Sequence, residues 1–215
     1  MSKEASRFVT VDELKIRVRT SNQLGTNQSK KPTVVLFHGY SFSLDEWEKI
    51  GTFDELSRWG IPYLALDLPK GKSTRSQRRE ESKLSAYVPL LKDVFQNVGL
   101  GPDSKLIMIG PSMGGGFALE YALENKNQVL GLVLIAPSLS GVDVESLADL
   151  DIPVLLIWGD KDTIFPLEEH GRKLKSLLSR SKLLIIKSAG HPAYLDRPQE
   201  FHELLLDFIE EVSAP

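Results

Sequence analysis

The chain has 215 residues, enough for a buried core, and we expect a single domain over residues 1–215. Hydrophobic residues make up 41% of the chain and charged residues 26%, which excludes a disordered or collagen-like protein. The net charge of −3 supplies no general positive field for a nucleic acid or an anionic membrane. Cysteine is absent, so disulfides, cysteine-ligated zinc and thiol nucleophiles are excluded as well.

Targeting signals are missing from the sequence. The first residues are charged, and no apolar stretch behind them is long enough for a signal peptide. No apolar run approaches the ~20 residues that a membrane-spanning helix needs. We therefore expect a cytoplasmic protein without a membrane span, and the oligomeric state stays open.

Taken in chain order, the predicted elements begin with a hairpin over residues 8–11 and 14–19 and continue with short apolar runs. These runs lie at residues 33–37, 63–66, 106–109, 130–135, 154–157 and 183–186. Each run is continuously apolar, which is typical of strands covered on both faces. Amphipathic segments of helical spacing lie between them. The sequence therefore predicts an α/β fold, with a mostly parallel sheet of about eight strands and helices on both faces.

Two polar segments interrupt this pattern. Residues 20–32 contain Gly25 and end in Pro32, and we interpret them as a turn between the hairpin and the first parallel strand. Residues 70–83 are rich in Lys and Arg but also contain Glu80 and Glu81. A solvated loop followed by the start of a helix explains this composition better than a phosphate or nucleic-acid site does.

A glycine-flanked serine marks the carboxyl end of one predicted strand, where sites gather in open α/β sheets. Gly110-x-Ser112-x-Gly114 follows an apolar run and precedes a helix-like segment, which is the context of a nucleophile elbow. The turn is so tight that glycine is needed on either side, and it presents the hydroxyl at a helix N-terminus. We predict that Ser112 is a nucleophile; the alternative is a glycine-rich turn with an incidental serine.

A serine hydroxyl needs a base to take its proton, and the chain offers four histidines. His38 precedes the serine, and we interpret it as a loop organiser. His170 and His202 lie in helix-like segments and are expected to be half-exposed helix residues. Only His191 directly follows a strand, in the loop of residues 190–192, and we predict that it is the general base.

Two acids after the fifth parallel strand could orient that base, Asp160 and Asp162. We prefer Asp162, because the residues after Gly159 give the chain room to turn this carboxylate towards His191. Asp160 is then a turn residue that bonds to nearby backbone. The resulting chain order of Ser, Asp and His is the one expected of an α/β sheet with this elbow.

An oxyanion hole needs two N–H donors near the nucleophile. The first is predicted to be the N–H of Met113, and the second the N–H of Tyr40, in the loop after the first parallel strand. This chemistry needs neither a cofactor nor a metal ion. The loops predicted to face the substrate pocket carry Tyr40, Phe42, Leu139, Phe165 and Tyr194.

Together these motifs resemble those of the α/β-hydrolase superfamily over nearly the whole chain. The matching segments are residues 36–39, 67–73, 110–115, 159–166 and 190–198. The resemblance implies a serine esterase whose triad is Ser112, Asp162 and His191, since the acid of this family usually ends a Gly-x-x-Asp segment.

A closer resemblance is to the small cap-less branch that includes CCG1-interacting factor B, and residues 38–43 with Trp47 and residues 190–198 carry it. It implies hydrolysis of small aryl esters and, for the named member, protein-lysine deacetylation. The chain departs from that member at Gly110, where the member has serine, and in a segment at residues 67–73 that is one residue shorter. Both departures favour plain ester hydrolysis.

The segment between two late strands indicates the size of the substrate. Residues 139–151 leave room for a turn or two of helix, so no cap domain is expected. Without a cap, little apolar wall encloses a long chain, and we predict a carboxylesterase for small-molecule esters with acyl groups of about two to six carbons. The alternatives are an amide or acetyl-lysine deacylase or a cofactor-free perhydrolase on the same triad, and a hydrolase-fold binding adaptor. No nucleic-acid partner is expected.

Overall fold

The computed structural model of the protein describes residues 5–24, 31–72, 74 and 83–214. The predicted hairpin and all six apolar runs form strands, so these predictions are confirmed. The Lys- and Arg-rich stretch at residues 70–83 lies mostly outside the described residues.

The strands are β1 (Arg7–Val11), β2 (Leu14–Thr20), β3 (Thr33–Leu36), β4 (Tyr63–Leu66), β5 (Leu106–Pro111), β6 (Val129–Ile135), β7 (Val154–Gly159) and β8 (Ser181–Ile186). The α-helices are α1 (Asp45–Lys49), α2 (Thr52–Arg58), α3 (Val88–Asn97), α4 (Met113–Glu124), α5 (Arg172–Leu177), α6 (Ala193–Asp196) and α7 (Pro198–Ser213). Shorter helical turns are η2 (Leu84–Tyr87), η3 (Glu145–Asp149) and η4 (Leu167–Gly171).

All eight strands form one sheet in the order β1-β2-β4-β3-β5-β6-β7-β8. Strand β2 pairs antiparallel with both β1 and β4. The other six strands, β3 to β8, pair with one another in parallel. The N-terminal hairpin therefore extends a parallel sheet, and the predicted mixed, mostly parallel sheet is confirmed.

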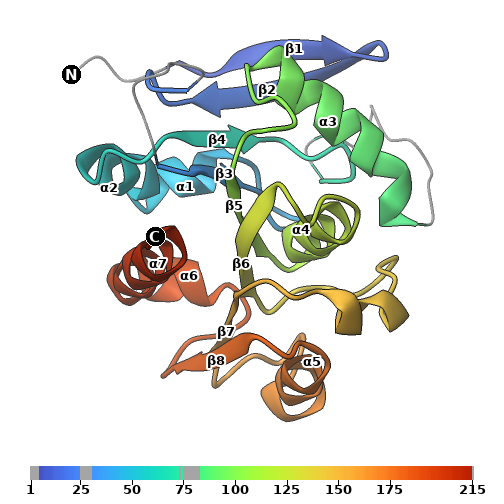
Figure 1. Cartoon of the computed structure of the whole chain (residues 1–215). Helices are drawn as coiled ribbons and strands as arrows, with labels where there is room; N and C mark the ends of the chain where they lie inside the picture. The colour runs from blue at the N-terminus through green and yellow to red at the C-terminus, as the bar shows by residue number, and fades with distance from the viewer. Residues whose placement is uncertain (1–4, 25–30, 73, 75–82, 215) are drawn as a thin grey trace.

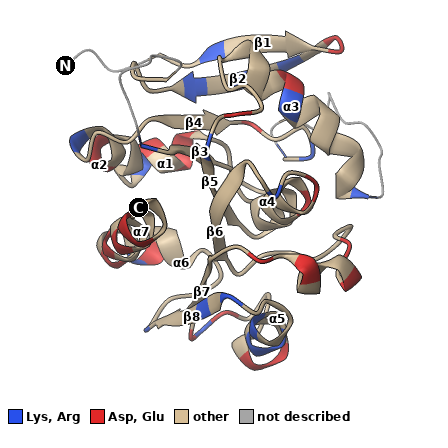
Figure 2. Ribbon diagram, in the orientation of Figure 1, with Lys and Arg blue, Asp and Glu red and all other residues tan. Residues whose placement is uncertain are grey.

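The sheet is covered on both faces, as Figure 1 shows by viewing it nearly edge-on: α1, α2, α6 and α7 lie over one face, and α3, α4 and α5 over the other. Each face has its own apolar core, centred on Trp47, Tyr194 and Phe201 on one side and on Phe117 and Trp158 on the other. The central strands β5, β6 and β7 carry no charged residue (Figure 2). Burial on both faces explains why they are apolar without alternation.

The parallel register brings the carboxyl ends of the central strands to one edge. Pro111 at the end of β5 lies beside Ile135 of β6, and Ile135 lies beside Ile157 of β7. The residues that follow these strands are therefore neighbours in space. Between β6 and β7 the chain forms only loops and η3, so the predicted absence of a cap domain is confirmed for this fully described segment. No helix in the described ranges is both long and apolar enough to cross a bilayer.

Candidate active site

Ser112 occupies the sharp turn between β5 and α4, with backbone angles φ 49° and ψ −117°. A positive φ is strained for a residue with a side chain and is found at functional turns. A Cβ on Gly110 would lie 2.3 Å from backbone atoms of Gly114, and a Cβ on Gly114 would lie 2.8 Å from the carbonyl oxygen of His38. Glycine is therefore required at both positions by backbone contact, which is the steric reason given for the elbow.

Backbone hydrogen bonds hold this turn against the next strand. The N–H of Ser112 donates to the carbonyl of Ile135 over 2.9 Å, and the carbonyl of Ser112 accepts from the N–H of Ser138 over 2.8 Å. The Ser112 side chain is half-buried at the start of the twelve-residue helix α4. Because the first N–H groups of a helix have no intrahelical acceptor, the N–H of Met113 faces this end without such a partner.

Asp162 and His191 meet directly in the structure. His191 Nδ1 lies 2.8 Å from Asp162 Oδ2, and the other carboxylate oxygen accepts N–H bonds from Ile164 and Phe165 over 2.8 and 2.9 Å. The Asp162 carboxylate therefore has three hydrogen-bond partners, and its contact with Nδ1 fixes the orientation of the His191 ring. With the proton on Nδ1, the Nε2 atom of His191 is left as the acceptor that a general base needs.

Asp160 lies apart from the ring of His191. Its Oδ1 accepts the N–H of Ser188 over 2.7 Å, and its Oδ2 lies 3.7 Å from Lys187 Nζ. Asp160 therefore bonds to backbone, as expected, but the N–H that it accepts belongs to the loop after β8 and not to its own turn.

A close backbone approach brings the two loops together. The N–H of Lys161 donates to the carbonyl of Ala189 over 2.9 Å. A Cβ on Gly159 would lie 2.2 Å from the carbonyl oxygen of Gly190, so the end of β7 touches the chain just before His191. This contact of Gly159 could not be predicted from the sequence, where the only local signal is a glycine that ends an apolar strand.

The structure does not join all three predicted triad residues by hydrogen bonds. Among the described residues, Ser112 Oγ makes no hydrogen bond to His191. Such catalytic bonds are often long without substrate and tighten when it binds. The ring of His191 is instead packed edge-on against Phe165, with 5.1 Å between ring centroids, and its side chain is 18% exposed.

His38 organises the loop that carries Tyr40. The ring is fully buried, its Nε2 accepts the N–H of Leu68 over 2.8 Å, and its Nδ1 lies 2.8 Å from the carbonyl of Gly39. These partners assign the proton to Nδ1, and burial lowers the pKa of His38, so the ring is neutral. Tyr40 itself is 42% exposed, and its carbonyl accepts the N–H of Lys72 over 2.8 Å.

A pocket of about 230 Å³ lies next to Phe165, the residue that packs on His191; Ser112, Asp162 and His191 are not among the residues that line it. Its lining comes from β7 itself and from the segments after β6 and after β7, namely Pro137, Ser138, Leu139, Ser140, Trp158, Phe165, His170 and Leu174. Leu139 and Phe165 lie in loops that are predicted to face the pocket, whereas Trp158 could not be predicted, because a tryptophan inside a buried strand is typical of the core. Trp158 Nε1 donates to the carbonyl of Phe165 over 2.8 Å and so fixes the loop after Asp162.

One sequence prediction needs correction, and one question that the sequence left open is answered. The sequence does not show whether Tyr194 lines the pocket; in the structure this side chain is fully buried against Trp47, with 4.9 Å between ring centroids. His202 was expected to be half-exposed, but it is only 9% exposed, and its Nε2 lies 3.0 Å from Thr52 Oγ1. In both cases the packing of α6 and α7 against α1 and α2 covers a face that the local pattern left open.

Comparisons with known proteins agree with this arrangement. Residues 28–146 match the family described as serine aminopeptidase, S33, and residues 144–198 match the alpha/beta hydrolase fold family. The chain is 32% identical over 181 residues to the Homo sapiens protein named "Putative protein-lysine deacylase ABHD14B", with 83% of each chain covered. It is 32% identical over 190 residues to Protein ABHD14A of Homo sapiens, covering 88% of this chain and 68% of that one.

A solved structure, a predicted CIB-like hydrolase from Thermoplasma acidophilum, superimposes with a TM-score of 0.83 at 27% identity, over 97% of this chain and 98% of that one. The resemblance expected from the motifs is thereby confirmed. The chain belongs to the α/β-hydrolase superfamily, as a serine hydrolase homologous to the ABHD14 proteins.

Proposed function

We propose that the protein is a carboxylesterase that cleaves short-acyl esters through an acyl-enzyme. Ser112 Oγ attacks the ester carbonyl carbon while His191 takes its proton, and Asp162 stabilises the resulting imidazolium. The bond to the alcohol breaks, and His191 returns the proton to the leaving oxygen. A water deprotonated by His191 then attacks the acyl carbon, the bond to Ser112 Oγ breaks, and His191 returns the proton to that oxygen. The observation that carries this proposal is the 2.8 Å contact between Asp162 and His191 at the same carboxyl edge of the sheet as a strained serine elbow.

The N–H groups of Met113 and Tyr40 are the proposed oxyanion donors. Met113 begins α4, where the helix dipole favours negative charge. A Cβ on Gly39, the residue before Tyr40, would lie 3.8 Å from the carbonyl oxygen of Pro111, next to the elbow. The Tyr40 loop therefore runs past Ser112, as an oxyanion loop must.

The pocket supports a short acyl group. Its volume of about 230 Å³ exceeds the ~150 Å³ of an apolar cavity that holds one benzene ring. Apolar side chains dominate its lining, with Leu139, Phe165 and Leu174 among them. A chain of two to six carbons fits this space, whereas a sixteen-carbon chain leaves most of its length in water.

The second candidate is an amide deacylase, and the names of the ABHD14B relatives favour it. The same triad attacks the amide carbonyl of an acylated lysine by the same steps. Gly110, where CCG1-interacting factor B has serine, is the departure from that relative that favours the ester.

The test measures hydrolysis of p-nitrophenyl esters from acetate to palmitate, beside an acetyl-lysine peptide. Ser112→Ala is compared with wild type, and Ser57→Ala, at an exposed position on α2, is the matched control. We expect turnover to peak on short esters and to fall by at least about 10³-fold only in Ser112→Ala. Full activity in that variant, or equal turnover of palmitate, contradicts the proposal. If the protein hydrolyses only the acetyl-lysine peptide, the amide deacylase replaces the esterase as the proposed function. A wild type without any turnover and without fluorophosphonate labelling overturns both.

A further inference from the structure

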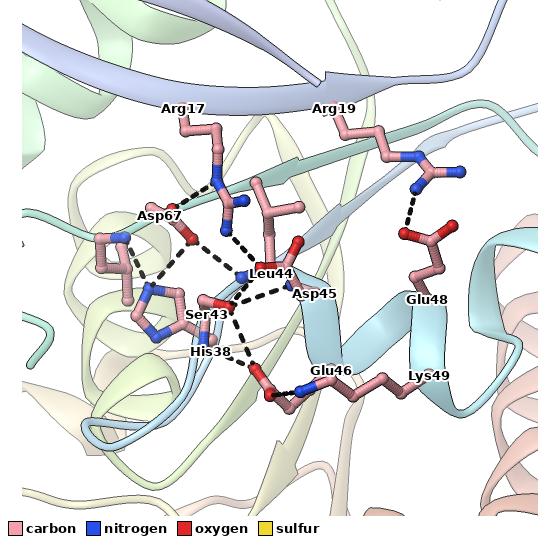
Figure 3. Close-up of polar contacts among 11 residues, drawn as sticks. Arg17, Arg19, His38, Ser43, Leu44, Asp45, Glu46, Glu48, Lys49 and Asp67 are labelled. Atoms are coloured by element: carbon pink, nitrogen blue, oxygen red, sulfur yellow. Dashed lines mark hydrogen bonds and ion pairs between the residues drawn. The ribbon is translucent and has the colours of Figure 1, made fainter. Parts of the chain in front are cut away.

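A polar network joins the N-terminal hairpin to the loop that follows β3 (Figure 3). Arg17, on β2, donates from Nε to Asp67 Oδ2 and from Nη2 to Asp45 Oδ2, both over 2.8 Å. Asp67 follows β4, and Asp45 begins α1. One guanidinium therefore bridges two carboxylates from separate parts of the chain.

Asp67 is the centre of this network. It is only 6% exposed, its Oδ1 accepts the N–H of Leu44 over 2.8 Å, and its own N–H donates to the carbonyl of Arg17 over 2.9 Å. A buried carboxylate is costly unless it is paired and hydrogen-bonded. Burial alone lowers the pKa of Arg17, but its bonds to Asp45 and Asp67 outweigh this and raise it, so Arg17 stays charged.

The network ends on the loop that carries Tyr40. Residues 38–44 are tied to residues 67–72 at three places: the ring of His38 accepts from Leu68, the carbonyl of Tyr40 from Lys72, and Asp67 from Leu44. The path of the loop therefore depends on the segment that follows β4. Arg17 holds the first residue of that segment.

We propose that Arg17 is a positioning residue for the oxyanion hole, holding the Tyr40 N–H beside Ser112 through Asp67 and Leu44. This inference rests on the proposed esterase. Without the guanidinium, the buried Asp67 carboxylate loses its ion-pair partner, and its side chain turns towards water. Leu44 then loses its acceptor, and the backbone from Tyr40 to Leu44 moves. Donors of an oxyanion hole act only when they are aimed at the developing charge, so the loss falls on the transition state.

Arg19 supplies a matched control on the same strand. It lies two residues further along β2 and also pairs with α1, through Glu48 over 2.9 Å, and its guanidinium lies 4.3 Å from the ring centre of Phe53. Figure 3 shows the two arginines side by side, Arg17 reaching Asp67 and Arg19 reaching Glu48. Replacing Arg19 removes its ion pair with Glu48, whereas replacing Arg17 removes the pairs with Asp45 and Asp67, so of these two arginines only Arg17 acts on Asp67.

The experiment compares Arg17→Met, Arg17→Lys and Arg19→Met with wild type. Each is assayed for kcat and KM on p-nitrophenyl butyrate, for Tm, and for Ki of a trifluoromethyl ketone, which forms a tetrahedral adduct with the serine. We expect kcat of Arg17→Met to fall about 10- to 100-fold with KM within about threefold, and Ki to rise in proportion. The kcat of Arg17→Lys is expected to be intermediate, because a single ammonium group cannot bond both carboxylates in the fixed geometry of the guanidinium. The Tm of Arg19→Met is expected to fall, while its kcat stays within about threefold of wild type.

The double variant Arg17→Met/Asp67→Asn keeps the inference testable where Arg17→Met does not fold. Asparagine at position 67 still accepts the N–H of Leu44 but leaves no stranded charge, so most of the wild-type kcat is expected to return. Equal kcat in Arg17→Met and Arg19→Met overturns the inference, as does a loss of kcat without a change in Ki. If the proposed esterase function is itself wrong, the wild-type protein neither hydrolyses esters nor reacts with a fluorophosphonate.

Discussion

Replacing Gly159 by alanine tests whether close backbone packing aligns Asp162 with His191. Gly159 ends β7, and a Cβ there would lie 2.2 Å from the carbonyl oxygen of Gly190 and 2.3 Å from that of Ala189. Its φ lies outside the left-handed range, so alanine meets no dihedral penalty at this position. The whole effect of the substitution therefore comes from contact with the neighbouring loop.

The size of the effect follows from the overlap. Ordinary contact with a Cβ begins at 3.4 Å, so the loop must retreat by about 1 Å. This movement carries His191 away from Asp162 and breaks the 2.8 Å bond between them. Overpacking of this kind costs about 1–3 kcal/mol of stability, and a misplacement of about 1 Å lowers catalysis by about 10²-fold.

The assay measures kcat/KM on p-nitrophenyl butyrate and the free energy of unfolding in urea. Gly101→Ala is the matched control, because a Cβ at Gly101 meets nothing within 4 Å. We expect Gly159→Ala to lose about 10²-fold in kcat/KM while Gly101→Ala stays near wild type. Wild-type activity and stability in Gly159→Ala would refute the reasoning, since the predicted overlap would then have no consequence.

Two further predictions concern the acid and the pH dependence of stability. Asp162→Asn is expected to lower kcat by about 10²- to 10⁴-fold by favouring the wrong tautomer of His191, whereas Asp160→Asn stays within about threefold; similar losses in both variants contradict the assignment. Burial lowers the pKa of His202 below its ordinary 6.5, so just below that pH the unfolded state binds more protons, and the free energy of unfolding falls as the pH drops. His202→Gln is expected to make this fall shallower between about pH 7 and pH 5 in urea denaturation, although buried His38 retains a fall of the same sign. An unchanged slope shows that His202 is not responsible.

Most of the fold could be predicted because each buried strand is recognisable from its own residues. A strand buried on both faces must be apolar at every position, and the runs at residues 106–109, 130–135 and 154–157 lie within β5, β6 and β7. The chirality of parallel connections then leaves few arrangements for them. The packing of α7 could not be predicted, since nothing in its own sequence shows that Thr52 of α2 contacts His202.

In the candidate site too, some residues could be predicted from local sequence and others only from the structure. Ser112 was found from its glycines, and Asp162 and His191 from their places after strands; their catalytic roles stay predictions. Arg17 could not be found, because basic residues on a short hairpin strand are also typical of a solvated face. Its partner Asp67 is fifty residues away in the chain, so only the pairing of β2 with β4 brings the two together.

The sequence by itself therefore determined what depends on local sterics and periodicity: buried parallel strands, a tight elbow at Ser112, and the order of the candidate triad. The tertiary structure alone decided which side chains meet across elements. It turned Tyr194 into the core, pressed Gly159 against Gly190, and joined Arg17 to Asp67. The physical reason is that a backbone turn is constrained by its own neighbours, whereas a buried charge or a close approach is constrained by whichever distant segment packs on it.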